Sequence, residues 1–204
     1  MVATSLEEQL KNALRENAEL RKRDETKSRQ ISELKELLRE ASMDSLTGLP
    51  GRQQFENRVN EELSQHHHHP EHHVSIFVVD LDHLKQVNDT HGHPAGDRMI
   101  VEFTQLFKTL MREYDIVARM TRGDEFAALL PGENHEGAKM VRQRLLQKFE
   151  ELKDSMLFFS GASIGVASTS EGLETFEELY AKADQDMYLH KEASRELLLV
   201  KKTA

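Results

Sequence analysis

The stretch ARMTRGDEFAALLP, residues 118–131, decides the fold of this chain. Two runs of strand-forming residues flank a Gly-Asp-Glu-Phe turn, and an arginine, Arg122, directly precedes the glycine, Gly123. Two such runs around a short glycine-containing turn predict a β-hairpin. Carboxylates at the tip of a hairpin either hold a metal ion or face water. An arginine beside them changes both the charge and the room at the turn.

The composition excludes several classes of protein. The chain has 204 residues, 38% of them hydrophobic, which is enough for one ordinary globular core and an appendage. It has no cysteine, which excludes thiol chemistry, and its formal net charge of −9 argues against a nucleic-acid binder. It contains neither an apolar run of about 20 residues nor a signal-peptide pattern, so we expect no membrane span and a cytoplasmic location.

The first 42 residues lack Gly and Pro and are rich in Leu, Glu, Lys and Arg, which predicts one long helix. Steps of three and four residues along it give a heptad seam that is apolar at both ends. We therefore expect residues 1–42 to form a parallel coiled-coil dimer. The alternative is a lone solvated helix. The seam consists of Leu6, Leu10, Ala13, Asn17, Leu20, Asp24, Lys27, Ile31, Leu34, Leu38 and Ala41.

Residues 43–204 are expected to form the globular domain. Strand patterns occur at 74–82, 115–120, 125–131 and 157–168, and helical patterns follow the turn at 44–51 and occur at 97–112, 136–152 and 175–195. This alternation predicts a central sheet covered by helices, in the α/β or α+β class. The histidine-rich stretch 66–73 is interpreted as a loop that would bind transition metals weakly and without a physiological role.

Acidic side chains stand at the ends of two predicted strands. Asp80 and Asp82 end the run 74–82, and Asp124 and Glu125 begin the second strand of the hairpin. Carboxylates from separate strand ends are suited to Mg²⁺, whose other coordination positions go to the phosphates of a nucleotide. Acids at strand ends are also common without any function, and the residues alone leave both interpretations open.

Several motifs resemble the GGDEF domains, the diguanylate cyclases that condense two GTP into cyclic di-GMP. DSLTGLPGR (44–52) is similar to the family motif D-x-L-T-G-L-x-N-R, and RGDEF (122–126) stands where Gly-Gly-Asp-Glu-Phe stands. DLDHLKQVNDTHGHPAGD (80–97), ASIGVA (162–167) and ADQDMYLHKEASR (183–195) are similar to further family segments. The resemblance covers residues 44–196 and implies a mostly antiparallel, nucleotide-cyclase-like sheet flanked by helices.

The resemblance also implies the site residues. Asp80, Asp124 and the carbonyl of Leu81 would hold Mg²⁺ or Mn²⁺, with Glu125 beside them. Asn88 and Asp97 would read guanine, which implies GTP rather than ATP. The phosphates and the nucleotide would lie against Lys85, Gly123, Lys191 and Arg195.

The segment REYD, residues 112–115, resembles the R-x-x-D motif that binds cyclic di-GMP in this family. An arginine can donate to O6 and N7 of guanine, and a carboxylate can accept from its other edge. Outside this family context, Arg112 and Asp115 would be interpreted as a surface ion pair.

The departures from the family pattern gather at the hairpin. Arg122 replaces the first glycine, and six residues rather than five separate it from Asp115. The extra residue predicts a bulge or a shift in the alternation of faces. Arg122 either obstructs the GTP pocket or pairs with a phosphate. The smaller departures are Gly51, Gln53, His83, Leu84, Ser194 and Glu196.

Three functions follow. The first is a bacterial signalling domain that binds cyclic di-GMP and passes the signal to a protein partner, with weakened or lost cyclase activity. The second is an active, product-inhibited diguanylate cyclase. The third is a structural dimer module that binds no nucleotide.

Overall fold

The computed structural model describes residues 2–120 and 123–203. The chain divides into two units, Met1–Ser42 and Met43–Ala204. The first unit is a single helix, α1 (Val2–Ala41), which confirms the helix predicted for this segment. Leu20, Ile31 and Leu34, which belong to the predicted seam, are exposed in the single chain. Pairing of two such helices therefore stays a prediction. No helix in the described part of the chain is long and apolar enough to cross a membrane.

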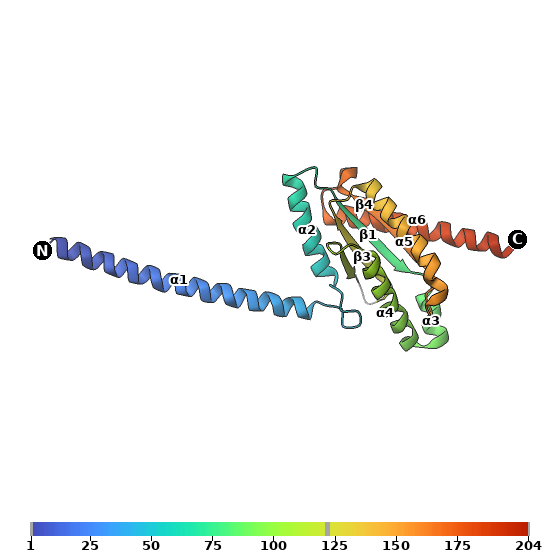
Figure 1. Cartoon of the computed structure of the whole chain (residues 1–204), viewed down its shortest axis with the longest axis horizontal. Coiled ribbons are helices and arrows are strands. Elements are labelled where there is room, and N and C mark those ends of the chain that lie inside the picture. The colour runs from blue at the N-terminus through green and yellow to red at the C-terminus, as the bar shows by residue number, and fades with distance from the viewer. Residues whose placement is uncertain (1, 121–122, 204) are drawn as a thin grey trace. The chain divides into compact units, whose positions relative to one another are not determined.

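The second unit is built on one four-stranded sheet (Figure 1). The strands are β1 (Val74–Leu81), β2 (Ile116–Arg119), β3 (Glu125–Pro131) and β4 (Ala162–Ser168). Their order is β2-β3-β1-β4, and each neighbouring pair is antiparallel. The structure thus confirms the predicted antiparallel sheet flanked by helices.

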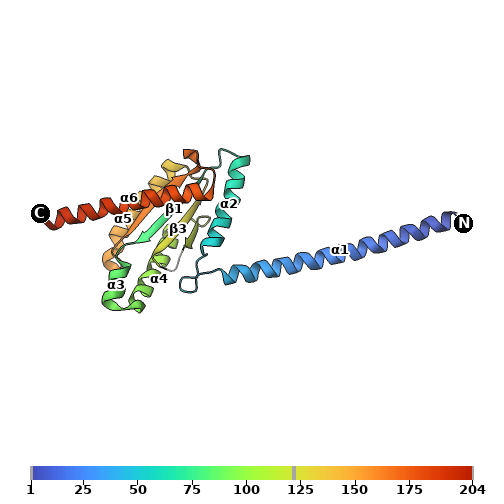
Figure 2. The ribbon, with the colours of Figure 1, turned by 180° about the vertical axis from the view of Figure 1, so that it is seen from behind.

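Helices cover both faces of the sheet. Helices α4 (His93–Leu110) and α5 (His135–Leu152) pack on one face, and α2 (Arg52–His68) and α6 (Phe176–Thr203) pack on the other (Figures 1 and 2). The short helix α3 (Leu84–His91) connects β1 to α4, and two 3₁₀ turns follow α5 and β4, at Lys153–Ser155 and Thr169–Glu171. The resulting three-layer arrangement buries the sheet between two apolar clusters.

The pleat of β1 determines which of its residues face which layer. Phe77 and Val79 pack toward α4 and α5, whereas Ile76 and Val78 pack toward α2 and α6. Because both faces are buried, the strand is a continuous apolar run rather than an alternating one. The same alternation puts Asp80 on the α6 side of the sheet.

Helix α6 lies unusually close to the edge strand β4. A Cβ on Gly165 would lie 1.9 Å from the carbonyl oxygen of Ala183 and 2.2 Å from the amide nitrogen of Met187, so only glycine fits beneath the helix backbone. In addition, Oδ2 of Asp186 accepts from the amide of Val166 at 2.9 Å. The helix thereby supplies a hydrogen-bond acceptor for a backbone amide of the edge strand, and this contact fixes the distance between α6 and the sheet.

The opposite edge strand, β2, is covered by the turn that opens the domain. The amide of Arg119 donates to the carbonyl of Pro50 at 3.0 Å. Within the turn, Oδ1 of Asp44 accepts from the amide and the hydroxyl of Thr47 at 2.9 and 2.7 Å. The family-like motif at 44–52 is therefore a structural turn that closes the edge of the sheet.

The structure corrects the predicted secondary structure at three places. Residues 84–91 form α3, although no helix was predicted there, and β4 begins at Ala162 rather than at residue 157. Residues 66–68 belong to the last turn of α2 and not to a loop. Short helices and frayed ends are the least reliable parts of a pattern-based prediction, because few residues define them.

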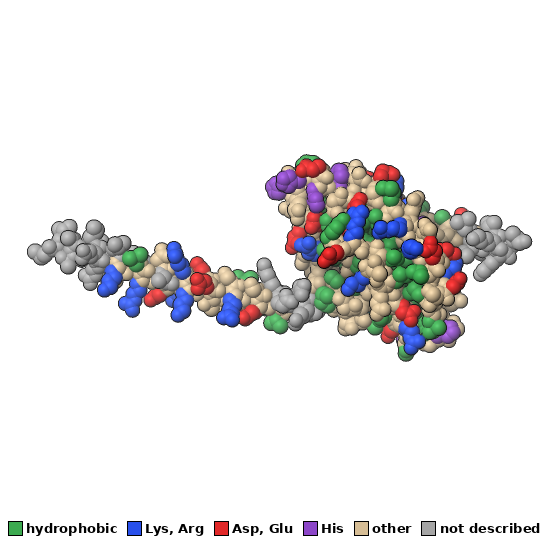
Figure 3. All heavy atoms as spheres, in the orientation of Figure 1, with side chains coloured by type: hydrophobic (Ala, Val, Ile, Leu, Met, Phe, Trp, Pro, Cys, Tyr) green, Lys and Arg blue, Asp and Glu red, His purple; other side chains and the backbone are tan. Residues whose placement is uncertain are grey.

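Histidine side chains gather at the C-terminal end of α2 (Figure 3). Nε2 of His72 lies 2.9 Å from Oε2 of Glu62, and Nδ1 of His66 lies 2.9 Å from the carbonyl oxygen of His72. Across residues 2–120 and 123–203, no three His, Asp or Glu side chains come together in a way that could hold a metal ion. These histidine contacts therefore fasten the end of α2 to the segment before β1.

Candidate functional site

Acidic side chains meet at one end of the sheet. Asp80, near the end of β1, pairs across the ladder with Glu125, the first residue of β3. The amide of Leu81 donates to the carbonyl of Asp124 at 3.0 Å, which fixes the start of β3 against the end of β1. The structure thus places the three acids at one end of the sheet, although no three of the described His, Asp and Glu side chains are arranged to hold a metal ion.

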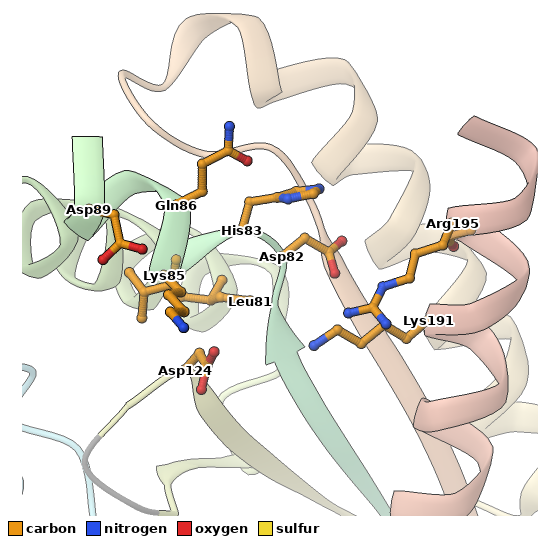
Figure 4. Close-up of a pocket in the computed structure, with 11 residues that line it drawn as sticks. Leu81, Asp82, His83, Lys85, Gln86, Asp89, Asp124, Lys191 and Arg195 are labelled. Carbon is orange, nitrogen blue, oxygen red and sulfur yellow. The ribbon is translucent and has the colours of Figure 1, made fainter. Parts of the chain in front are cut away.

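A pocket of about 430 Å³ opens at this end of the sheet (Figure 4). Lys191 and Arg195 enter it from α6, Lys85 from α3 and Asp124 from the start of β3. We call it the nucleotide pocket, after the ligand that the resemblance to GGDEF domains implies. It is lined by Leu81, Asp82, His83, Leu84, Lys85, Gln86, Asp89, Asp124, Lys191, Ser194 and Arg195.

An ion pair joins Lys191, which lines the nucleotide pocket, to Asp80, which does not line it. Nζ of Lys191 donates to Oδ1 of Asp80. Burial raises the pKa of the Asp80 carboxyl; the hydrogen bond and charge of Lys191 oppose this shift, and the charges of Asp124 and Asp82 add to it. Acidic and basic side chains both line the pocket, with Asp82, Asp89 and Asp124 on one hand and Lys85, Lys191 and Arg195 on the other. The pairing of Lys191 with Asp80 was not predicted, because the two residues are far apart in the sequence.

The two predicted guanine readers do not line this pocket. Asn88 lies on α3 and Asp97 on α4, and Gly92, whose φ is +83°, separates the two helices. A Cβ on Gly96 would lie 2.0 Å from Oδ1 of Asn88, so the absence of a side chain there lets the Asn88 amide pack beside the first turns of α4. The structure thus brings Asn88 close to the segment that carries Asp97.

The hairpin differs from the prediction. Its ladder runs without interruption from Ile116↔Leu129 to Arg119↔Phe126, and the amide of Met120 then donates to the carbonyl of Glu125 at 3.0 Å. The predicted bulge or shift of faces is therefore not found among residues 116–120 and 125–129. Arg122 itself lies outside the described residues.

Arg119 ties this loop to the opening turn of the domain. Its Nε and Nη2 donate to the carbonyl of Gly123 at 3.2 and 2.9 Å, and its Nη1 donates to Oδ1 of Asp44 at 3.0 Å. Burial alone would raise the pKa of Asp44, but hydrogen bonds from Thr47 and Arg119 outweigh it, and the pKa lies below its ordinary value. Sequence analysis did not assign a role to Arg119.

Residues 112–115, the RxxD turn, form a second and separate constellation. The amide of Arg112 donates to Oδ2 of Asp115 at 2.8 Å, and the amide of Asp115 donates to the carbonyl of Arg112 at 3.1 Å. Oδ1 of Asp115 is buried and has no hydrogen-bond partner among the described residues. Burial raises the pKa of Asp115, and the amide and charge of Arg112 oppose that shift.

Tyr114, within the RxxD turn, and Glu133 and Arg144, outside it, interact with Arg112 or Asp115. Nη1 of Arg112 donates to the hydroxyl of Tyr114 at 2.9 Å and to Oε1 of Glu133. Nη2 of Arg144 donates to the carbonyl of Leu110 at 3.1 Å, and its charge lowers the pKa of Asp115. Neither Glu133 nor Arg144 was predicted, because both reach the turn only through the packing of β3 and α5.

Comparison with known proteins decides the family. The family model described as "Diguanylate cyclase, GGDEF domain" matches residues 41–197. The chain belongs to the GGDEF-domain family. It is 33% identical over 183 residues to the diguanylate cyclase TpbB of Pseudomonas aeruginosa, and the match covers 88% of this chain but 42% of TpbB. The chain thus spans less than half the length of this relative.

Two solved structures of GGDEF proteins are also similar. The diguanylate cyclase SiaD of P. aeruginosa, in complex with its activator SiaC, is 32% identical with a TM-score of 0.67, and the match covers 93% of this chain and 73% of that one. The coiled coil and GGDEF domain of DgcB from Caulobacter crescentus, in complex with cyclic di-GMP, has a TM-score of 0.69, and the match covers 87% and 94% of the two chains. DgcB is 24% identical, so this likeness shows the fold alone.

Proposed function

We propose that this GGDEF domain binds cyclic di-GMP at the RxxD turn and signals its presence, and that its diguanylate cyclase activity is weakened or lost. The observation that carries the proposal is the buried Oδ1 of Asp115, which has no partner among the described residues, in a turn where Oδ2 of the same side chain accepts from the backbone amide of Arg112. A buried acceptor without a donor is costly. A ligand that supplies N–H groups would remove that cost.

Guanine matches these groups. The guanidinium of Arg112 can donate to O6 and N7 of one guanine, and Asp115 can accept from the N1–H and N2–H₂ edge of a guanine. The charge of Arg144 favours an anionic ligand on the same side of the turn.

The nucleotide pocket fits GTP with Mg²⁺ or Mn²⁺. Asp80, Asp124 and the Leu81 carbonyl are hard oxygen donors, and a magnesium site commonly uses one or two carboxylates and takes its other ligands from phosphates and water. A bound metal ion would withdraw charge from the phosphate under attack.

The remaining predicted residues have complementary roles in this proposal. The phosphates are bound by Lys85, Lys191 and Arg195. When the nucleotide binds, Lys191 leaves its ion pair with Asp80 and donates to a phosphate oxygen instead. Asn88 and Asp97 read the guanine, and Glu125 stands beside the metal. Gly123 allows the loop backbone to approach the nucleotide.

The hairpin is the reason for proposing weak turnover. The loop between β2 and β3 is one residue longer than the family spacing, and Arg122 replaces a glycine at a position where the backbone approaches the ligand. Catalysis requires the reacting groups to be held within a few tenths of an ångström. The RxxD turn carries no comparable change.

An active, product-inhibited diguanylate cyclase is the second candidate. It is favoured by the pocket itself, in which Asp124, Lys191 and Arg195 converge although they come from different elements. Formation of cyclic di-GMP from GTP and Mg²⁺ separates this candidate from the first. A chain that binds neither nucleotide would instead be a structural module.

The binding proposal is tested by isothermal titration of cyclic di-GMP into the full chain. Arg112→Ala should weaken binding by at least about tenfold, or about 1.4 kcal/mol, because a charged bidentate contact is lost. Arg58→Ala removes an exposed arginine of α2 and is the matched control, so its affinity should equal that of the parent. Equal affinity of Arg112→Ala and the parent would refute the assignment of this site.

We further propose that α1 forms a parallel coiled-coil homodimer, which raises the effective concentration of one GTP site opposite the other. Removal of residues 1–42 should give a monomer in sedimentation experiments at concentrations where the full chain is a dimer. A truncated chain that is still a dimer would contradict this. The proposed ligands imply a cytoplasmic location in a bacterium, and a receptor role implies a protein partner.

A further inference from the structure

Glu133 is held in place beside the RxxD turn by its backbone. It follows the turn after β3, where Gly132 has a φ of +77° and donates its amide to the carbonyl of His73 at 2.7 Å. The carbonyl of Glu133 accepts from the hydroxyl of Ser75 at 2.7 Å. The sheet thus presents the Glu133 side chain to the turn at a fixed position.

Arg112 holds one oxygen of the Glu133 carboxylate, and the other oxygen lies in the space left by Gly137. Oε1 of Glu133 accepts from Nη1 of Arg112, and Oε2 of Glu133 lies over the first turn of α5, where a Cβ on Gly137 would be only 2.2 Å away. Negative charge is favourable at the N-terminus of a helix. The glycine therefore leaves room for a carboxylate that bridges α5 and Arg112.

We propose that Glu133 is an internal competitor for the guanidinium of Arg112 and raises the concentration of cyclic di-GMP needed to fill the site. This inference rests on the proposed function. The Glu133 carboxylate accepts a hydrogen bond from Nη1 of Arg112, which also donates to Tyr114. It neutralises the guanidinium that the guanine and phosphate groups of the ligand require. Ligand binding must then break or weaken an ion pair that the free protein already makes.

The charges around the turn support competition. Asp115 and Glu133 are two carboxylates beside Arg112. The charge of Glu133 contributes to the raised pKa of Asp115, and the charges of Arg112 and Arg144 oppose that shift. Asp115 has the buried acceptor that guanine can use, whereas Glu133 already has its partner. A dianionic ligand approaching Arg112 is repelled by Glu133.

The alternative role is positioning, in which Glu133 holds Arg112 ready for the ligand. The two roles predict opposite signs. Loss of the Glu133 charge tightens binding if Glu133 competes, and weakens it if Glu133 positions Arg112.

The test is isothermal titration of cyclic di-GMP into full-length variants. Glu133→Gln should lower Kd by about threefold to fivefold, the range expected for a partly exposed ion pair. Gly137→Ala should lower Kd in the same direction, because the new Cβ displaces the Glu133 carboxylate without removing it. Glu136→Gln is the control: it removes an equal charge from the neighbouring first turn of α5, where Glu136 pairs with Lys139, and should leave Kd unchanged.

The outcomes separate this inference from the proposed function. If Glu133→Gln binds cyclic di-GMP as tightly as the parent or more weakly, the inference about Glu133 is overturned. The proposed binding site still stands in that case if Arg112→Ala weakens binding. Binding only after Glu133→Gln, and lost again on adding Arg112→Ala, supports both. Failure of the parent, Glu133→Gln and Gly137→Ala to bind overturns both.

Discussion

The nucleotide pocket and the RxxD turn are built in opposite ways. The pocket takes its side chains from β1, α3, β3 and α6, whereas Arg112 and Asp115 form a single turn closed by two hydrogen bonds between them. Burial raises the pKa of Asp80, beside the pocket, and of Asp115, in the turn. A site assembled from distant elements depends on the whole scaffold, and a local turn depends mainly on itself.

The largest predicted effect is that of a substitution beneath α6, which should disturb the nucleotide pocket and leave the RxxD turn unchanged. Gly165→Ala forces a Cβ against the backbone of α6, which should cost about 3 kcal/mol of unfolding free energy and lift Lys191 from Asp80. Chemical denaturation measures the first effect and GTP titration the second. At temperatures where the variant is folded, cyclic di-GMP should bind as in the parent.

A folded Gly165→Ala variant with parental stability and GTP affinity would show that α6 does not set the geometry of the pocket. Equal loss of both ligands would show that the two regions are not independent.

The second effect concerns the ion pair between Asp44 and Arg119. Asp44→Asn should lower the unfolding free energy by about 2 kcal/mol at neutral pH, because Arg119 then lacks its charged partner in a buried position. The folded-state pKa of Asp44 lies below 3.8, so its contribution is present above that value and is lost as the pH falls through the folded pKa. Denaturation at several pH values should show the difference between variant and parent narrowing in strong acid; a constant difference would contradict the assignment.

The sequence was informative where patterns are local and strong. The continuous apolar run of β1, the two strands around Gly123 and the long periodic helix α1 were all predicted from the types and spacing of their residues. Of the residues that the family motifs suggested for the nucleotide site, the pocket is lined by Leu81, Lys85, Asp124, Lys191 and Arg195, whereas Asp80, Asn88, Asp97, Gly123 and Glu125 do not line it. Local patterns and motifs were sufficient for these parts.

Contacts between distant segments could not be predicted. The pairing of Lys191 with Asp80, of Arg119 with Asp44 and of Arg112 with Glu133 each joins elements that only the folded sheet brings together. The ladder register also showed that residues 116–119 pair regularly with residues 126–129, which a count of residues could not decide.

The smallest predicted effect lies in the RxxD turn. Asp115→Asn should raise the unfolding free energy by about 0.5 kcal/mol at neutral pH, because it removes a charge that burial disfavours. The folded-state pKa of Asp115 is raised, so this gain exists above that pKa and disappears as the pH falls below the ordinary value of 3.8. Denaturation measures the gain, and cyclic di-GMP should bind more weakly. Lower stability together with unchanged binding would contradict the role given to Asp115.

The central claim is that the hairpin limits turnover while the RxxD turn keeps its ligand. The most direct test is the rate of cyclic di-GMP formation from GTP and Mg²⁺ by the parent and by Arg122→Gly combined with deletion of Thr121. We expect the repaired chain to form product at least about tenfold faster, because the family spacing and the close backbone approach are restored. A parent that is already active and becomes slower on repair would contradict the claim and show that Arg122 serves the reaction.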